Sequence, residues 1–101
     1  MTTSVEDSSE RARYEVTVDG ALAGFAAYRD RPGDIRVFTH TEIDGAYEGR
    51  GLGGLLVSTA LDDVRSRGLT IRPLCPFVRG YLERHPQYAD LVDPGYRAPD
   101  A

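Results

Sequence analysis

Four glycines lie within six residues of this chain, at positions where the main chain could bind an anion. They are Gly49, Gly51, Gly53 and Gly54, and the apolar residues after them recur with a helical period. Without a Cβ, glycine lets main-chain N–H groups turn toward a ligand. The first turn of a helix adds N–H groups without intrahelical partners and the positive end of the helix dipole. The segment therefore predicts a phosphate cradle that needs no lysine, and the chain contains none.

Two phosphate-binding patterns of other folds match this glycine loop only in part. A P-loop needs Gly-Lys-Ser/Thr at the helix start, which is absent here. Gly49, Gly51 and Gly54 fit the Rossmann spacing, but that pattern follows a first strand, whereas this loop follows three. It also needs an acidic residue ~20 positions later, where this chain has Leu69 to Ile71, none of which is acidic. A connector whose glycines merely cap the helix is the plain structural alternative.

Three β-like runs precede the loop, and they alternate at residues 14–18, 21–28 and 35–43. Asp19-Gly20 separates the first two runs and is the strongest short hairpin signal. Residues 30–34 contain Pro32-Gly33 and predict a second turn. These features predict three antiparallel strands in a meander.

Helical periodicity begins at the glycine loop and ends at Gly68, which suits the position after a helix C-terminus. A short strand at residues 69–74 and a helix at residues 77–84 follow. A strand after a helix can lie parallel to the third strand through a right-handed crossover. We therefore expect an α/β fold: a mixed sheet of about four strands, an antiparallel meander and then a parallel strand, flanked by two to three helices.

Length and composition predict one soluble domain. The chain has 101 residues, 41% of them hydrophobic and 28% charged, and no apolar run near the ~20 residues that span a bilayer. Residues 1–12 are polar and lack periodicity, so we expect a disordered N-terminal tail without a signal peptide, followed by a single domain at residues 13–101. A single cysteine suits a cytoplasmic location. The net charge of −4 argues against a nucleic-acid partner.

The third β-like run carries two side chains that could exchange protons. Alternation places His40 and Glu42 on one face of the strand, so the two could share a site. Glu42 could take a proton from a nucleophile directly or through water. A solvated strand face is the alternative explanation for both residues. One cysteine and two histidines show no metal-ligand spacing, so no metal is expected.

Several motifs together resemble one family. Glu48-Gly49-Arg50-Gly51-Leu52-Gly53 resembles the Gln/Arg-x-x-Gly-x-Gly/Ala motif of the Gcn5-related N-acetyltransferases, with glutamate in place of the usual first residue. His40-Thr41-Glu42, Cys75-Pro76-Phe77 and His85-Pro86-Gln87-Tyr88 are similar to motifs of the small, truncated members of that superfamily. The resemblance runs from about Tyr14 to Tyr88.

The resemblance implies acetyl-CoA as cosubstrate, with its pyrophosphate on the glycine loop and its pantetheine along the end of the third strand. The cofactor-binding residues it implies are Ile43, Glu48, Gly49, Arg50, Gly51, Leu52, Gly53 and Gly54. Besides Glu42 and His40, it implies Cys75 and Tyr81 as catalytic candidates. Cys75 could protonate the leaving thiolate or accept the acetyl group, and Tyr81 stands near the position of the family's tyrosine acid. Packing is the alternative for both side chains.

The implied function is transfer of an acetyl group to an amine of an unknown acceptor, which could be a protein or peptide. Larger family members build an acceptor pocket from helices between their first two strands, whereas only Asp19-Gly20 joins them here. The alternative is a non-catalytic acyl-CoA-binding module that acts with a partner protein. Both hypotheses need the glycine loop for binding. They differ in whether Cys75, Glu42 and His40 are needed for catalysis. Neither a membrane nor a nucleic acid is expected as a partner.

Overall fold

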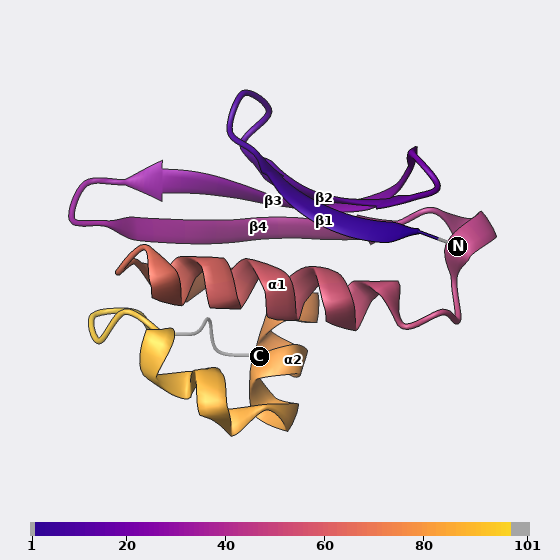
Figure 1. The fold of residues 1–101 in the computed structure, drawn as a ribbon. Coiled ribbons are helices and arrows are strands. Elements are labelled where there is room, and N and C mark those ends of the chain that lie inside the picture. The colour runs from indigo at the N-terminus through magenta and orange to yellow at the C-terminus, as the bar shows by residue number, and fades with distance from the viewer. Residues whose placement is uncertain (1, 98–101) are drawn as a thin grey trace.

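The computed structural model describes residues 2–97 and contains one mixed sheet in the order β1-β2-β3-β4-β5 (Figure 1). Its strands are β1 (Thr3–Ser8), β2 (Arg13–Val18), β3 (Ala21–Arg31), β4 (Ile35–Ile43) and β5 (Thr70–Pro73). Strands β1 to β4 are antiparallel, and β5 runs parallel to β4. The predicted meander followed by a parallel strand is confirmed, with five strands where about four were expected.

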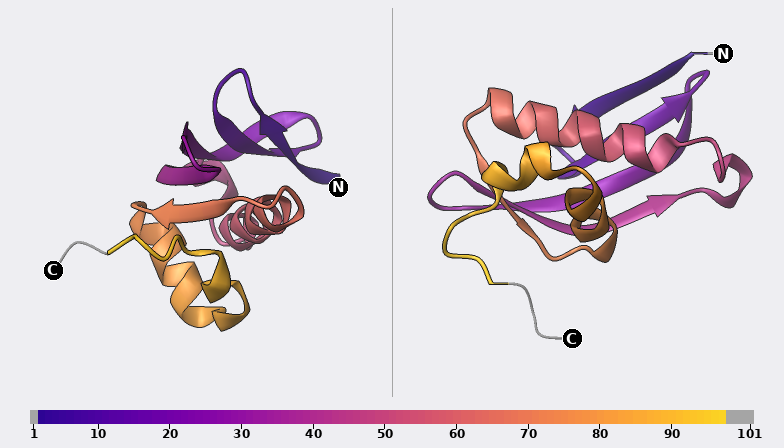
Figure 2. Two further views of the ribbon diagram at one scale, coloured as in Figure 1. Left: turned by 90° about the vertical axis from the view of Figure 1, so that its left-hand side faces the viewer. Right: turned by 90° about the horizontal axis from the view of Figure 1, so that it is seen from below.

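The helices lie on one face of the sheet and leave the other face open (Figures 1 and 2). They are α1 (Leu52–Ser66) and α2 (Pro76–Arg84), with 3-10 turns η1 (Gly45–Tyr47) and η2 (Pro86–Leu91). Helix α1 packs across the sheet, α2 packs beside it against β4 and β5, and η2 packs against both helices. The α1 helix is the crossover between β4 and β5, as the sequence predicts.

The additional strand is β1, so the prediction that residues 1–12 are a disordered tail is wrong. Thr3–Ser8 pairs antiparallel with β2 over its whole length. The Ser4 and Thr17 hydroxyls lie 2.9 Å apart across the pair, and the Tyr28 hydroxyl donates to Asp7 at 2.5 Å. These partners are far away in the sequence, and β1 has little apolar surface of its own. Its polar composition therefore concealed a strand that cross-strand hydrogen bonds stabilise.

Backbone geometry confirms the predicted Asp19-Gly20 turn and the predicted helix end at Gly68. Asp19 and Gly20 both have positive φ, at 50° and 82°, which is the conformation of the tight hairpin turn that this dipeptide favours. Gly68 has φ of 69° just after the C-terminus of α1, as expected of a residue in the left-handed cap position.

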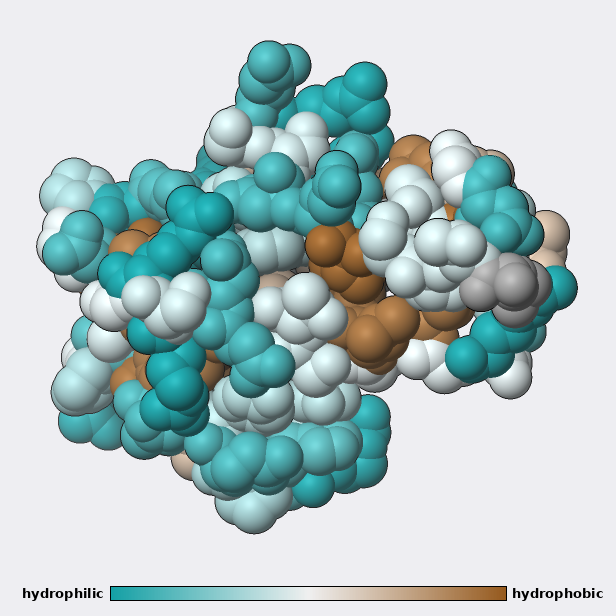
Figure 3. Space-filling view, in the orientation of Figure 1, coloured by the Kyte–Doolittle hydropathy of each residue, from teal (hydrophilic) through white to brown (hydrophobic). Residues whose placement is uncertain are grey.

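The core lies between the sheet and α1. Its fully buried side chains include Tyr14, Val16, Phe38, Leu56, Leu61, Val64, Ile71 and Val78. In the orientation of Figure 1, hydrophobic residues reach the surface only in small groups between hydrophilic ones (Figure 3). No described helix has the length and apolar character needed to cross a membrane.

One arginine is buried in this core. Arg36 is 5% exposed, donates to both Asp30 carboxylate oxygens at 2.8 and 2.9 Å, and donates to the Tyr14 hydroxyl at 2.7 Å. Tyr14 in turn donates to Asp63 of α1 at 2.6 Å. Burial and the bond to Asp63 raise the pKa of Tyr14 well above its ordinary value, so this hydroxyl stays a donor. The network joins β2, β3 and β4 to α1.

Replacing Arg36 with leucine is expected to lower the free energy of unfolding by about 3 kcal/mol, because it leaves buried polar partners without their charged donor. Arg65→Leu is the matched control, since Arg65 pairs with an exposed Asp90 at 2.8 Å and should contribute less than about 1 kcal/mol. Urea unfolding measures both variants. Equal losses in the two variants would show that the Arg36 network does not stabilise the fold.

Candidate functional site

The glycine loop connects η1 to the first turn of α1. Gly49 and Gly51 both have positive φ, at 80° and 74°, a conformation that side-chain-bearing residues adopt only with strain. Gly51 is the N-cap of α1, and no side chain caps the helix start. The first N–H groups of α1 therefore keep their donor capacity, next to the positive end of the helix dipole.

A cavity of about 360 Å³ lies in front of this helix start, between the end of β4 and the starts of α1 and α2. The predicted binding residues that line it are Ile43, Glu48, Gly49, Gly51, Leu52, Gly53 and Gly54. Arg50, also predicted, does not line this cavity, and its guanidinium lies 5.3 Å from the centroid of the Tyr47 ring. The structure thus brings seven of the eight predicted binding residues to one cavity.

Phe77 is a lining residue that sequence reasoning did not assign to the site. A Cβ placed on Gly53 would lie 2.6 Å from the tip of its ring, so the ring can lie there only because residue 53 is glycine. Phe77 is 41% exposed and stands at the start of α2. The sequence signal that could have assigned Phe77 to the site is its position directly after the Cys75-Pro76 motif.

Strands β4 and β5 separate beside this cavity. They pair only from Ile35 to Phe38, and the last main-chain hydrogen bond runs from the Cys75 N–H, just after β5, to the Phe38 carbonyl at 3.0 Å. Beyond it, residues 39–43 have no strand neighbour on the β5 side among the residues described. This stretch leaves main-chain donors and acceptors next to the glycine loop.

A β-bulge at Thr39 decides which way the end of β4 faces. Ala27 opposes His40 and Tyr28 opposes Phe38, so Thr39 has no partner on β3. Regular alternation would place His40 and Glu42 on the helix-covered face with Phe38. The extra residue instead turns them to the open face and turns Thr41 toward the helices. Bulges commonly re-aim side chains in this way.

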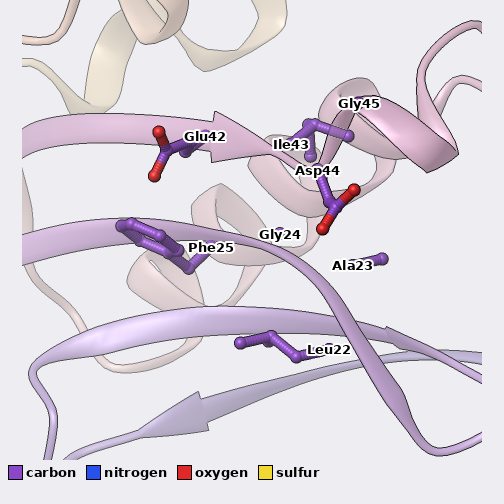
Figure 4. A pocket seen from close by; sticks show the side chains of 8 residues that line it. All are labelled: Leu22, Ala23, Gly24, Phe25, Glu42, Ile43, Asp44 and Gly45. Carbon is purple, nitrogen blue, oxygen red and sulfur yellow. The ribbon is translucent and has the colours of Figure 1, made fainter.

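His40 and Glu42 lie together on that open face, as the alternation predicts for the pair. The His40 Nε2 atom is 4.0 Å from a Glu42 carboxylate oxygen, and both side chains are more than 60% exposed. Glu42 lies at the edge of a second cavity of about 370 Å³, lined by residues 22–25 and 42–45 (Figure 4). Phe25 stands beside Glu42, and the centroid of its ring lies 6.0 Å from that of the His40 ring.

The other two catalytic candidates lie on the helix side. Cys75 is 2% exposed, is the N-cap of α2, and donates its thiol hydrogen to the Thr41 hydroxyl at 3.3 Å. Thr41 lines the cavity at the glycine loop. A short path of direct contacts therefore joins Cys75 to that cavity.

Tyr81 is 8% exposed and stacks on His85, with ring centroids 3.9 Å apart. Its ring lies beside the start of α1, 3.9 Å from where a Cβ on Gly54 would stand. The Tyr81 hydroxyl makes no hydrogen bond to another group in the described part of the chain. The four catalytic candidates thus fall into two pairs on opposite faces of the sheet, with the end of β4 that β5 does not pair lying between them.

Within residues 2–97 there is no group of three or more His, Cys, Asp or Glu side chains that could hold a metal ion. The chemistry of this site is that of main-chain donors, two exposed proton-exchanging groups, a buried thiol and a tyrosine.

Comparison with known proteins identifies the family to which this arrangement belongs. The model of the GCN5-related N-acetyl-transferase family matches residues 13–91. Protein NATD1 from human is 35% identical over 96 residues, covering 89% of this chain and 82% of that protein. The mouse protein of the same name is 29% identical over 96 residues, covering 89% and 84%.

Solved structures show the same fold. A GCN5-like protein from Staphylococcus aureus, solved by NMR, superposes with a TM-score of 0.68 at 18% identity, covering 96% of this chain and 90% of that one. N-acetylglutamate synthase from Neisseria gonorrhoeae, solved with coenzyme A and N-acetyl-glutamate, has a TM-score of 0.56 at 17% identity, covering 78% of this chain and 22% of that one. The family model matches most of the chain, and the solved structures share its fold. This protein therefore belongs to the GCN5-related N-acetyltransferase family.

Proposed function

We propose that this protein transfers an acetyl group from acetyl-CoA to an amine, and that the acceptor is a protein or peptide. One observation carries the proposal: a single cavity joins the uncapped N-terminus of α1 to the end of β4 that β5 leaves without a neighbour. The first feature suits a pyrophosphate and the second suits the amide-bearing arm of the same molecule. The N-acetylglutamate synthase neighbour was solved with coenzyme A bound, which supports this choice of ligand.

Acetyl-CoA supplies an activated acyl thioester, and the chain's own groups would hold and orient it. Main-chain N–H groups of the glycine loop and of Leu52, Gly53 and Gly54 would bind the pyrophosphate oxygens. The free main-chain groups of Thr41 and Ile43 would pair with the pantetheine amides. Acetyl-CoA bound in this way would have its reacting carbon near the point where β4 and β5 separate.

The open face of the sheet gives the acceptor amine its approach. Glu42 would take a proton from the amine directly or through a water molecule, with His40 beside it. On the helix side, Cys75 or Tyr81 would return a proton to the departing thiolate. No helix within residues 2–97 covers the open face, which suits a bulky acceptor. A lone cysteine held as a thiol suits a reducing compartment, and we propose that the reaction takes place in the cytoplasm.

Release of CoA from acetyl-CoA in the presence of lysine-containing peptides, amino-terminal peptides and polyamines tests the proposal. We expect turnover with at least one amine class and acetylated product detectable by mass spectrometry. CoA binding without transfer to any of them would contradict an enzymatic role and favour a non-catalytic acyl-CoA-binding module.

Replacing Cys75 with alanine is expected to leave the CoA affinity unchanged, because the thiol reaches the cavity through the Thr41 side chain. Turnover should fall about tenfold, because a proton donor to the departing thiolate is lost. Cys75→Ser is the control, since a hydroxyl can keep the bond to Thr41. Mass spectrometry after exposure to acetyl-CoA distinguishes the routes: one added acetyl group that disappears in Cys75→Ala indicates transfer through the thiol. Unchanged turnover in Cys75→Ala would remove this residue from the mechanism.

A further inference from the structure

We propose that a groove on the open face of the sheet binds acidic side chains of the acceptor peptide. This inference rests on the proposed function and specifies the acceptor. The groove has a volume of about 310 Å³, and its lining includes Arg29, Arg31, Arg72, Val37, Leu74 and Tyr96. Among the residues described, its lining contains three arginines and no acidic residue, in a chain whose net charge is −4. We call it the arginine groove.

The arginines are set side by side by the strand register. Arg29 on β3 opposes Val37 on β4, and Val37 opposes Arg72 on β5. Side chains of opposed residues share a face, so Arg29 and Arg72 flank one valine, with their Cα atoms about twice the ~4.8 Å strand spacing apart. An anion bound between them would pair with the Arg29 charge, which no carboxylate in the described residues neutralises.

Two of these arginines have side chains without a polar partner in the part of the chain that the structure describes. The side chains of Arg29 and Arg31 form no ion pair or hydrogen bond with another group in residues 2–97. Arg11, Arg13, Arg36, Arg65 and Arg67, by contrast, each pair with a carboxylate. Arg72 donates its Nε–H to Asp93 at 2.8 Å, which holds the guanidinium in place at the groove. Arg29 and Arg31 therefore offer positive charge that no carboxylate in the described part of the chain neutralises.

The floor of the groove favours a peptide over a nucleic acid. Val37 is 7% exposed and lies outside the main core, and Leu74 is 45% exposed, so apolar side chains can pack between the charges. Elsewhere the surface is unsuited to a long polyanion. A hollow beside β1 is lined by Glu6, Asp7, Glu10 and Glu15, and their negative charge would repel a nucleic-acid backbone.

The groove lies on the same face as the proposed base. Phe25 opposes Glu42, and Phe25 and Arg29 share a face of β3 because they are four residues apart. At ~3.4 Å per residue, Arg29 is about 14 Å from this point along the strand. An extended peptide whose amine reaches Glu42 would therefore place its fourth residue, or a neighbour of it, over the arginine groove.

Two fluorescein-labelled peptides test the inference in the presence of CoA, by fluorescence anisotropy. One carries a lysine followed after three to five residues by glutamates, and the other carries glutamines at the same places. We expect the wild-type protein to bind the glutamate peptide about tenfold more tightly, with the preference reduced by added salt. The Arg29→Gln, Arg31→Gln double variant should lose this preference. Arg84→Gln, at an exposed arginine on α2, is the matched control and should keep it.

Equal affinity of the wild-type protein for both peptides would overturn the inference, as would a preference that survives in the double variant. Arginine-dependent binding of an oligonucleotide, or arginine-dependent self-association, without a preference between the peptides would also overturn it. The binding measurement requires no turnover. A protein that prefers the glutamate peptide but acetylates no amine would contradict the proposed function and leave the arginine groove supported.

Discussion

Replacing Gly53 with valine is expected to lower the affinity for CoA at least about a hundredfold while the protein remains folded. A Cβ at this position would lie 2.6 Å from the Phe77 ring, so either the ring or the start of α1 must move. The branched side chain would also stand in front of the N–H groups that bind the pyrophosphate. Each hydrogen bond to a charged group contributes about 1.5–3 kcal/mol, and losing two of them accounts for a hundredfold change.

Isothermal titration with CoA, with circular dichroism to verify folding, measures this effect. Gly80→Val is the matched control, because a Cβ on Gly80 would make only an ordinary contact, 3.5 Å from the Arg84 side chain. The double variant Gly53→Val, Phe77→Ala separates two causes. If blocked N–H groups are responsible, removing the ring does not restore binding. Wild-type affinity in a folded Gly53→Val protein would contradict the cradle.

Glu42→Gln is expected to lower kcat about a hundredfold and to leave the affinity for CoA unchanged. Glutamine keeps the size and polarity of the side chain at this exposed position but cannot accept the proton of the amine. Because Glu42 faces away from the glycine loop, it should not contribute to CoA binding. Steady-state kinetics with the best amine substrate, together with titration of CoA, separates the two quantities.

Glu6→Gln is a suitable control for Glu42→Gln, since Glu6 is a carboxylate on the edge strand β1, in the acidic hollow away from the site. It should leave kcat and CoA affinity as they are. A Glu42→Gln protein with normal kcat would exclude Glu42 as the base and direct attention to a water molecule or to His40.

Local rules predicted the parts of this fold that single residues specify. Asp19-Gly20 adopts the positive φ angles of a tight turn, and four glycines mark the start of α1. The strand β1 could not be predicted in the same way, because its stability comes from pairing with β2 and from the bond between Asp7 and Tyr28, 21 residues later. Short polar segments carry no periodic signal for such pairing.

The candidate site shows the same division. Its binding residues are contiguous in sequence, and seven of the eight predicted line one cavity. Its catalytic candidates are dispersed, and a bulge at Thr39 decides that His40 and Glu42 face away from Cys75 and Tyr81. No turn residue marks this bulge, since its position follows from how β3 and β4 pair. The contact between Gly53 and Phe77 likewise depends on the packing of α2 against α1.

Thermal unfolding with acetyl-CoA, CoA, pantetheine or NAD tests the central claim most directly, namely that the glycine loop and the start of α1 bind the pyrophosphate of CoA. A ligand present at a hundred times its Kd and bound only by the folded state stabilises it by about 2.7 kcal/mol, which raises the Tm of a domain this size by about 10 °C or more. We expect this rise with acetyl-CoA and CoA, little change with pantetheine, which lacks the pyrophosphate, and none with NAD. No rise with either CoA species, or an equal rise with NAD, would contradict the account.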